Sequence, residues 1–231
     1  MRTLILSAAL LLSGATMTWA QQNNQPRQRM TTLAGGLEIG VPIGEFDDTW
    51  GRQLVGLSGN ITLPMRRLPL SYGFDFSWAS MGGSSREVPV NEPYLAFTTG
   101  DLSVRSNVYG YHGLLRLQPF QGKVSPYVDG MFGLRHFVTR TKIEVDGMDQ
   151  PYLEQRNESS MVGSTGLAAG IYYAPARNIV LEGRVERLTG GLVNYVDPRS
   201  IEISPGGDVQ YSTLSSGTRI VNITFGIGLR F

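Results

Sequence analysis

One pattern recurs through most of the chain: large apolar side chains alternate, residue by residue, with glycine, small polar or charged side chains. Successive side chains of a β-strand point to opposite faces, so strict alternation predicts strands whose two faces meet different surroundings. The C-terminal segment is the clearest, because Val221, Ile223 and Phe225 alternate with Asn222 and Thr224. Alternation recurs at residues 33–41, 55–63, 70–78, 108–117, 128–138, 164–173, 179–186 and 219–231. The sequence therefore predicts an all-β fold of eight strands.

The sizes of the side chains indicate which face points inward. One face carries Phe, Trp, Tyr, Leu and Ile, and the other carries Gly, Ala, Ser and charges. In a water-soluble barrel or sandwich, the bulky set would overfill a small core while glycines and charges faced solvent. The opposite arrangement removes this conflict, with the bulky set toward lipid and the small and ionic set in a narrow lumen. Lipid offers no hydrogen-bond partners, so such a sheet must close on itself. We expect a closed eight-stranded antiparallel up-and-down transmembrane β-barrel.

The connections between the predicted strands alternate in length. Outer-membrane barrels have short periplasmic turns and longer external loops. With the N-terminus in the periplasm, the first connection must be external, and the observed order of long and short connections fits that phase. The short connections are residues 64–69, 119–125 and 175–178, and the long ones, predicted as external loops, are residues 42–52, 80–101, 140–160 and 189–216.

The N-terminal residues have the layout of an export signal. Arg2 precedes an apolar run at residues 4–12, and Thr18-Trp19-Ala20 resembles a cleavage site, with a second candidate site at residues 13–15. The run is too short for a membrane-spanning helix, which needs about 20 apolar residues. A buried N-terminal helix is the alternative interpretation. We expect a signal peptide at residues 1–20, a flexible periplasmic leader at 21–30 and a barrel domain at 31–231.

The composition excludes several other classes. The net charge of +1 gives no indication of nucleic-acid binding. Absence of cysteine from the sequence excludes a disulfide-stapled fold and an anchor attached to an N-terminal cysteine.

The C-terminal strand also carries a family resemblance. It alternates to a terminal aromatic residue, and over residues 31–231 the chain resembles the eight-stranded outer-membrane barrels of the outer membrane protein A and OmpX type. The resemblance implies a monomer in the bacterial outer membrane that contacts outer-membrane lipids and lipopolysaccharide. It also implies passage through periplasmic chaperones and the outer-membrane barrel assembly machinery. The side chains that this machinery would read are Phe225, Ile227, Leu229 and Phe231.

The face predicted to line the lumen holds charges of both signs. Buried charges persist only when they are paired, so we expect an ionic network that fixes strand register and blocks the bore. A narrow pore for small solutes is the alternative, although an eight-stranded barrel leaves room only for side chains or one small ligand. The network is expected to contain Glu38, Asp75, Arg116, Asp129, Arg135, Glu182, Arg184, Glu186 and Arg230, with His112 nearby.

Catalysis and metal binding have little support in the sequence. The chain has two histidines, and alternation directs His112 inward and His136 outward; neither lies in a His-x-Ser arrangement of the kind found in lipid-modifying barrels. The acidic clusters at 47–48 and 146–149 lack the spacing of a calcium loop. We therefore expect no catalytic activity, metal or cofactor. The function is expected to lie in the external loops, in surface contact or envelope integrity; a lipid-modifying enzyme remains an alternative.

Aromatic side chains fall near the ends of several predicted strands. Such positions favour the girdles that flank the lipid-facing band of an outer-membrane barrel. The candidates are Tyr72, Trp78, Tyr127, Tyr173 and Phe231.

Overall fold

The computed structural model of the protein describes residues 30–66, 68–92, 95–145, 150–197, 200–203 and 209–231. The predicted signal peptide, the leader up to residue 29 and the acidic cluster at 146–149 lie outside the described residues.

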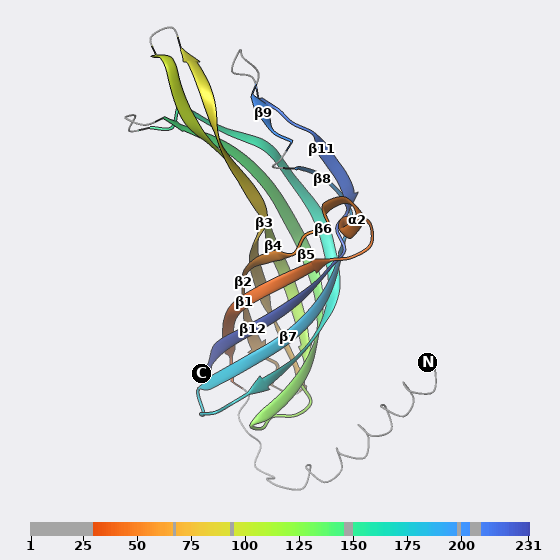
Figure 1. Ribbon diagram of the computed structural model, residues 1–231. Helices are drawn as coiled ribbons and strands as arrows, with labels where there is room; N and C mark the ends of the chain where they lie inside the picture. The colour runs from red at the N-terminus through yellow and green to blue at the C-terminus, as the bar shows by residue number, and fades with distance from the viewer. Residues whose placement is uncertain (1–29, 67, 93–94, 146–149, 198–199, 204–208) are drawn as a thin grey trace.

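Eight antiparallel strands form a closed barrel, as the alternation predicted (Figure 1). Around the barrel the strands follow the order β1-β12-β7-β6-β5-β4-β3-β2. Each barrel strand pairs with the next barrel strand along the chain. β12 closes the ring against β1, from Thr32↔Arg230 to Pro42↔Ile220. The strands are β1 (Thr32–Pro42), β2 (Leu54–Pro64), β3 (Leu70–Glu92), β4 (Leu95–Leu117), β5 (Val124–Val145), β6 (Leu153–Tyr173), β7 (Ile179–Gly190) and β12 (Ile220–Arg230).

The outer surface of the barrel is apolar on every strand. Phe132 and Phe225 keep 66% and 68% of their surface exposed, whereas Glu38 and Asp129, on the opposite face, keep 3% and 0%. Large apolar side chains thus point away from the axis, and polar ones fill the lumen. One exposed apolar residue from each strand illustrates the band: Leu37, Leu57, Phe74, Leu115, Phe132, Leu167, Val185 and Phe225.

The second and third long connections, at 80–101 and 140–160, are not loops, and this part of the prediction is wrong. The β3–β4 ladder continues to Glu92↔Leu95 and the β5–β6 ladder to Ile143↔Leu153. β4 and β5 also stay paired to Gly100↔Val145. Strands β3 to β6 therefore run on beyond the ring as a curved four-stranded sheet, here called the extension (Figure 1). Backbone pairing does not stop at the membrane surface, because each added pair still satisfies two polar groups.

The first and fourth long connections fold over the barrel mouth. The first contains the short helix α2 (Glu45–Trp50). The fourth contains β8 (Leu192–Val196), β9 (Glu202–Ile203), β10 (Val209–Gln210) and β11 (Thr213–Gly217), which pair as β8 with β11 and β9 with β10. Val196 and Ile201 from this connection pack with Leu102, Val104 and Ile143 of the extension. The extension is therefore covered on its inner face (Figure 1).

Four of the five side chains predicted to form the girdle lie on the outer face of the barrel. Tyr72, Tyr173 and Phe231 are exposed on the outer surface, and Trp78 is half-buried on that face. Tyr127 is instead 2% exposed, because it lies on the same face of β5 as Asp129 and points into the lumen.

Among the described residues, no helix is long and apolar enough to cross a membrane.

A closed antiparallel barrel with an apolar outer band, short turns at one end and long connections at the other is the architecture of bacterial outer-membrane proteins. The short turns lie between β2 and β3, β4 and β5, and β6 and β7. The chain folds as an outer-membrane β-barrel, and its C-terminus lies at the end that carries the short turns, which is the periplasmic end in such barrels.

Candidate functional site

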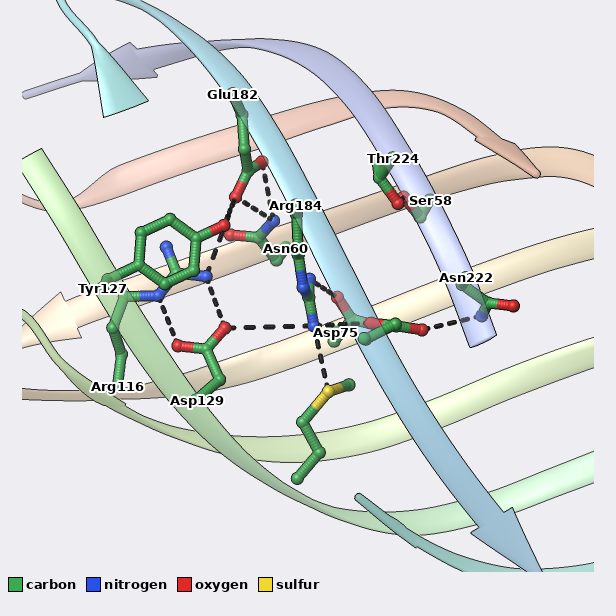
Figure 2. Close-up of polar contacts among 12 residues, drawn as sticks. Ser58, Asn60, Asp75, Arg116, Tyr127, Asp129, Glu182, Arg184, Asn222 and Thr224 are labelled. Atoms are coloured by element: carbon green, nitrogen blue, oxygen red, sulfur yellow. Dashed lines mark hydrogen bonds and ion pairs between the residues drawn. The ribbon is translucent and has the colours of Figure 1, made fainter. Parts of the chain in front are cut away.

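The lumen holds two linked clusters of ion pairs (Figure 2). The first is centred on Arg116 of β4, which faces Asp129 of β5 across the ladder. Its Nε and Nη2 lie 2.7 and 2.8 Å from the two carboxylate oxygens of Asp129. The guanidinium carbon lies 3.7 Å from the centre of the Tyr127 ring, and Nη1 donates to the Tyr172 hydroxyl. This bidentate, stacked geometry is the strong form of an arginine–carboxylate pair.

Glu182 of β7 closes this first cluster. Its carboxylate accepts hydrogen bonds from the Tyr127 hydroxyl and from Asn60 Nδ2, the latter at 3.2 Å. It also lies 3.8 Å from Arg116 Nη2. Each charge is thus hydrogen-bonded as well as paired, which a buried charge requires.

Arg184 of β7 forms the second cluster. Its Nη1 lies 2.6 Å from Asp75 Oδ2, and its Nη2 lies 2.9 Å from Glu186 Oε2. Asn222 of β12 donates to the other oxygen of Glu186 at 2.7 Å. Arg184 Nη2 also lies 3.9 Å from Asp129, which joins the two clusters. The linked network connects β2, β3, β4, β5, β7 and β12 across the lumen.

Three predicted members lie outside these ion pairs. Arg135 is buried and donates to the backbone carbonyl of Thr218 at 3.2 Å. Glu38 is buried and borders a cavity of about 10 Å³ together with Arg135 and Asn222. Arg230 is half-buried at the periplasmic end, 5.1 Å from the Tyr172 ring centre.

His112 points into the lumen, as alternation predicted. The imidazole is 1% exposed, and neither ring nitrogen has a hydrogen-bond partner among the described residues. No carboxylate or hydroxyl in the described part of the chain therefore orients His112 for proton transfer.

A glycine makes room for the aromatic part of the network. A Cβ at Gly170 would lie 2.3 Å from Tyr127 Cζ, closer than atoms can approach. Gly170 therefore leaves the space that the Tyr127 ring occupies where it stacks on Arg116.

An aromatic cap, which was not predicted from the sequence, closes the lumen at the external end. Phe46 and Trp50 of α2 are buried against Tyr195 of β8, with ring centres 5.8 and 5.7 Å apart. Phe137 of β5 completes the group, 6.3 Å from Phe46. The sequence feature that could have indicated the cap is the four-residue spacing of Phe46 and Trp50, which places both on one face of a helix.

Further apolar side chains lie between the cap and the ionic clusters. They pack with the cap in one buried cluster and include Leu54, Val108, Leu188 and Ile220. At the periplasmic end Ala34, Tyr127, Tyr172 and Val180 form a second buried cluster. The lumen is therefore filled in sequence by apolar, ionic and aromatic groups.

Tyr195 is held at the mouth by a hydrogen bond as well as by packing. Its hydroxyl lies 2.9 Å from Ser216 Oγ of β11. Burial raises the pKa of Tyr195, so its hydroxyl stays neutral. The cap is thereby tied to both strands of the β8–β11 hairpin.

The outer surface brings His136 and Ser159 together. His136 of β5 points outward, as alternation predicted, and its Nε2 lies 2.9 Å from Ser159 Oγ of β6. The pair was not predictable from a His-x-Ser motif, because the two residues lie on neighbouring strands and 23 positions apart in the chain. Among the described residues, no carboxylate is hydrogen-bonded to His136.

The remaining candidate residues lie apart from the lumen. The four predicted assembly residues, Phe225, Ile227, Leu229 and Phe231, are exposed on the outer surface. Asp47 and Asp48 are exposed on α2. No group of three or more metal-ligating side chains gathers within the described ranges.

No protein-family model matches the chain, and no curated protein matches its sequence. Solved structures do match. A major outer membrane protein from Thermus thermophilus is 15% identical, with 87% of this chain and 99% of that chain covered and a TM-score of 0.47. Neisserial surface protein A is 14% identical, with 87% and 97% covered and a TM-score of 0.41. Ail, the attachment invasion locus protein of Yersinia pestis, is 15% identical, with 88% and 99% covered and a TM-score of 0.41. At this level of similarity, none of them assigns an activity, ligand or partner to this chain.

Proposed function

We propose that the protein is a non-conducting outer-membrane barrel that displays a rigid extracellular sheet for contact at the cell surface. The observation that carries the first part is the filling of the lumen. Arg116, Asp129 and Arg184 are 3% exposed or less, and apolar clusters lie on both sides of them. An eight-stranded barrel has little space beyond such side chains.

Planar-bilayer recording tests the closed lumen against the narrow pore. Purified protein should add no unitary current steps in potassium chloride, whereas an open porin in the same chamber gives them. The pore alternative would be correct if wild-type protein produced steps that disappeared when a bulkier side chain was placed in the lumen, as in Ser77→Phe. Ser77 borders the small cavity beside Glu38, so this change narrows any residual path.

The second part of the proposal concerns the extension. The function was expected in the external loops, but at two of them β3 to β6 form a continuous ladder with a covered inner face. A preformed surface loses little conformational freedom on binding, which favours a role in contact.

Shortening one hairpin tests this role. Replacing residues 85–103 by a two-residue turn removes the outer part of β3 and β4 at the paired positions Ser85 and Ser103. Cells carrying this variant should insert the barrel normally but lose adherence to surfaces. Unchanged adherence, with normal envelope permeability to a dye, would contradict the proposal.

A lipid-modifying enzyme is the second candidate, and the His136–Ser159 pair is the observation that favours it. A histidine can activate a serine hydroxyl at this distance, but an orienting acid normally supports the histidine. Incubation of the protein with lipopolysaccharide followed by mass spectrometry of the lipid tests it. Loss of an acyl chain with wild type but not with Ser159→Ala would establish the enzyme; an unchanged lipid would exclude this activity.

We also propose that the C-terminal strand is the assembly signal. Phe225, Ile227, Leu229 and Phe231 present a continuous apolar row on the outer surface of β12 and just beyond it. Deleting Phe231 should lower the inserted fraction in cells, whereas deleting the exposed Gln210 of the external connection should leave insertion unchanged. Normal insertion without Phe231 would refute this role.

A further inference from the structure

Strand register places three arginines side by side on the outer face of the extension. Arg105 of β4 lies opposite Arg140 of β5, and Arg140 lies opposite Arg156 of β6. All three side chains are exposed. A bulge between Thr139 and Arg140 brings Arg156 into this row. We call these residues the arginine row.

Like charges directly opposite on neighbouring strands destabilise a sheet unless something compensates them. Within the described residues, none of the three arginines has an acidic side chain within ion-pair distance. The nearest charged side chains on this face also leave the three arginines without an acidic partner. Lys142 and Glu154 oppose each other in the next row outward, and Lys142 pairs with Glu144.

The surroundings of the row leave it accessible. At the β3 position of the same row stands Gly83, which has no side chain. The row nearer the membrane contains Asn107, Val138 and Ser159. On the side toward the barrel and at the β3 position, the neighbours of the three arginines are therefore small or uncharged.

The row lies at a defined height above the lipid-facing band. The last aromatic row of that band joins Trp78, Tyr109 and His136 across the ladder. Arg105 lies four residues farther from the barrel than Tyr109 on the same strand. At about 3.4 Å per residue and a tilt of about 40°, this is roughly 10 Å along the membrane normal. Headgroups occupy the region just outside the hydrocarbon core.

We propose that the arginine row binds the phosphate groups of lipopolysaccharide in the outer leaflet. Arginine matches phosphate with two parallel hydrogen bonds, and neighbouring arginines can share an anion or bind adjacent ones. Lipid phosphate is favoured over free phosphate because the row faces outward, directly above the lipid-facing band. The proposal requires the membrane placement of the barrel but is independent of whether the lumen conducts.

The test measures lipopolysaccharide binding to the full barrel in nanodiscs of zwitterionic phospholipid. The variant R105Q/R140Q/R156Q removes the row. The variant R66Q/K123Q/R177Q removes three positive charges from the periplasmic turns and is the matched control. We expect the first variant to bind about tenfold to a hundredfold more weakly than wild type, and the control to stay within about twofold.

A conservative variant separates charge from folding. R105K/R140K/R156K keeps the positive charge and should retain binding within about tenfold of wild type, because lysine still attracts phosphate as a point charge. Circular dichroism and thermal unfolding report whether each variant is folded. Equal loss in the glutamine and control variants, or unchanged binding without the row, would overturn the proposal.

Two further ligands distinguish the sources of phosphate. Lipopolysaccharide from which the phosphates have been removed should bind wild type as weakly as intact lipid binds the R105Q/R140Q/R156Q variant. Inorganic phosphate at millimolar concentration should compete poorly. Full binding of the dephosphorylated lipid, or competition by free phosphate at the concentration of the lipid, would refute a lipid-phosphate site.

Discussion

Within the membrane, strands β3 to β6 turn their large apolar side chains outward, whereas in the extension the same strands turn them inward. On β5, Phe132 and Leu134 are exposed on the outer face. Farther along, Ile143 and Val145 are buried on the inner face, and Lys142 points outward. The backbone ladder is continuous across this change. The surroundings, lipid or water, thus decide which face is apolar.

The change takes place within a few residues. Arg135 and Phe137 are successive inward residues of β5, and the guanidinium carbon lies 5.2 Å from the centre of the phenyl ring. Below this point the lumen side is ionic, and above it the inner side is apolar. The aromatic cap therefore sits at the boundary between the two regions.

The largest expected effect comes from the ionic interior of the barrel. Arg184→Met leaves Asp75 and Glu186 buried without their partner and should lower the free energy of unfolding by about 3–5 kcal/mol. Urea unfolding in lipid vesicles, followed by tryptophan fluorescence, measures it. Arg187→Met removes an exposed charge from the same strand and should change stability by less than about 0.5 kcal/mol. Equal effects would show that the lumen network does not stabilise the barrel.

A charge on the outer face should distinguish the two regions directly. Phe132→Arg places a cation in the lipid-facing band and should cost about 2–4 kcal/mol. Ser85→Arg places one on the same outer face of the extension, in water and opposite the uncharged Ser103, and should cost less than about 0.5 kcal/mol. The same unfolding titration compares them. A tolerated arginine at Phe132 would mean that this face does not contact lipid.

A smaller, local effect is expected inside the extension. Ile143→Val removes one methylene from its covered face and should cost about 1 kcal/mol. Hydrogen exchange should speed up at the amides of Leu102 and Val104 and stay unchanged in the barrel. Ile171→Val, on the lipid-facing surface, leaves no cavity and serves as the control. Faster exchange throughout the barrel would show that the two regions unfold as one unit.

The smallest effect is expected for the exposed ion pair between Lys142 and Glu144. Both side chains are largely in solvent, at 42% and 60% exposure, so Lys142→Ala should cost no more than about 0.5 kcal/mol. Thermal unfolding at low and high salt measures this, and Ser103→Ala on the neighbouring strand is the reference. A cost above about 1 kcal/mol would indicate that this pair belongs to a larger charge network.

The sequence predicted the barrel because the lipid-facing alternation is strong and its phase is constant within each membrane segment. It did not predict the extension, because the apolar residues Leu102, Val104 and Ile143 follow the opposite phase there. Gly82 and Gly83 interrupt the apolar alternation of β3 at the point of change, and a register shift occurs beside Gly82. The outward-facing apolar alternation therefore ends where the surroundings change from lipid to water.

Alternation predicted the direction of most charged side chains of the lumen, but it placed Tyr127 outside and did not predict the contacts. Alternation directed Arg116, Arg184 and Glu38 inward, yet which acid each arginine meets depends on the stagger between strands. Arg184 reaches Asp75 across the barrel, from β7 to β3, rather than along a ladder. Cross-lumen pairs of this kind follow from the closed geometry, which no local pattern contains.

The pairing of β1 with β12 has a consequence for biogenesis. The first and last strands meet, so the ring can be completed only after the whole polypeptide has been delivered. Until then both of these strands carry a row of open amide and carbonyl groups, which is a template for joining other chains. Contacts so distant along the chain also form slowly. We therefore expect closure of the sheet between β1 and β12 to be the slowest step of folding. Until closure, the open polypeptide needs protection by chaperones.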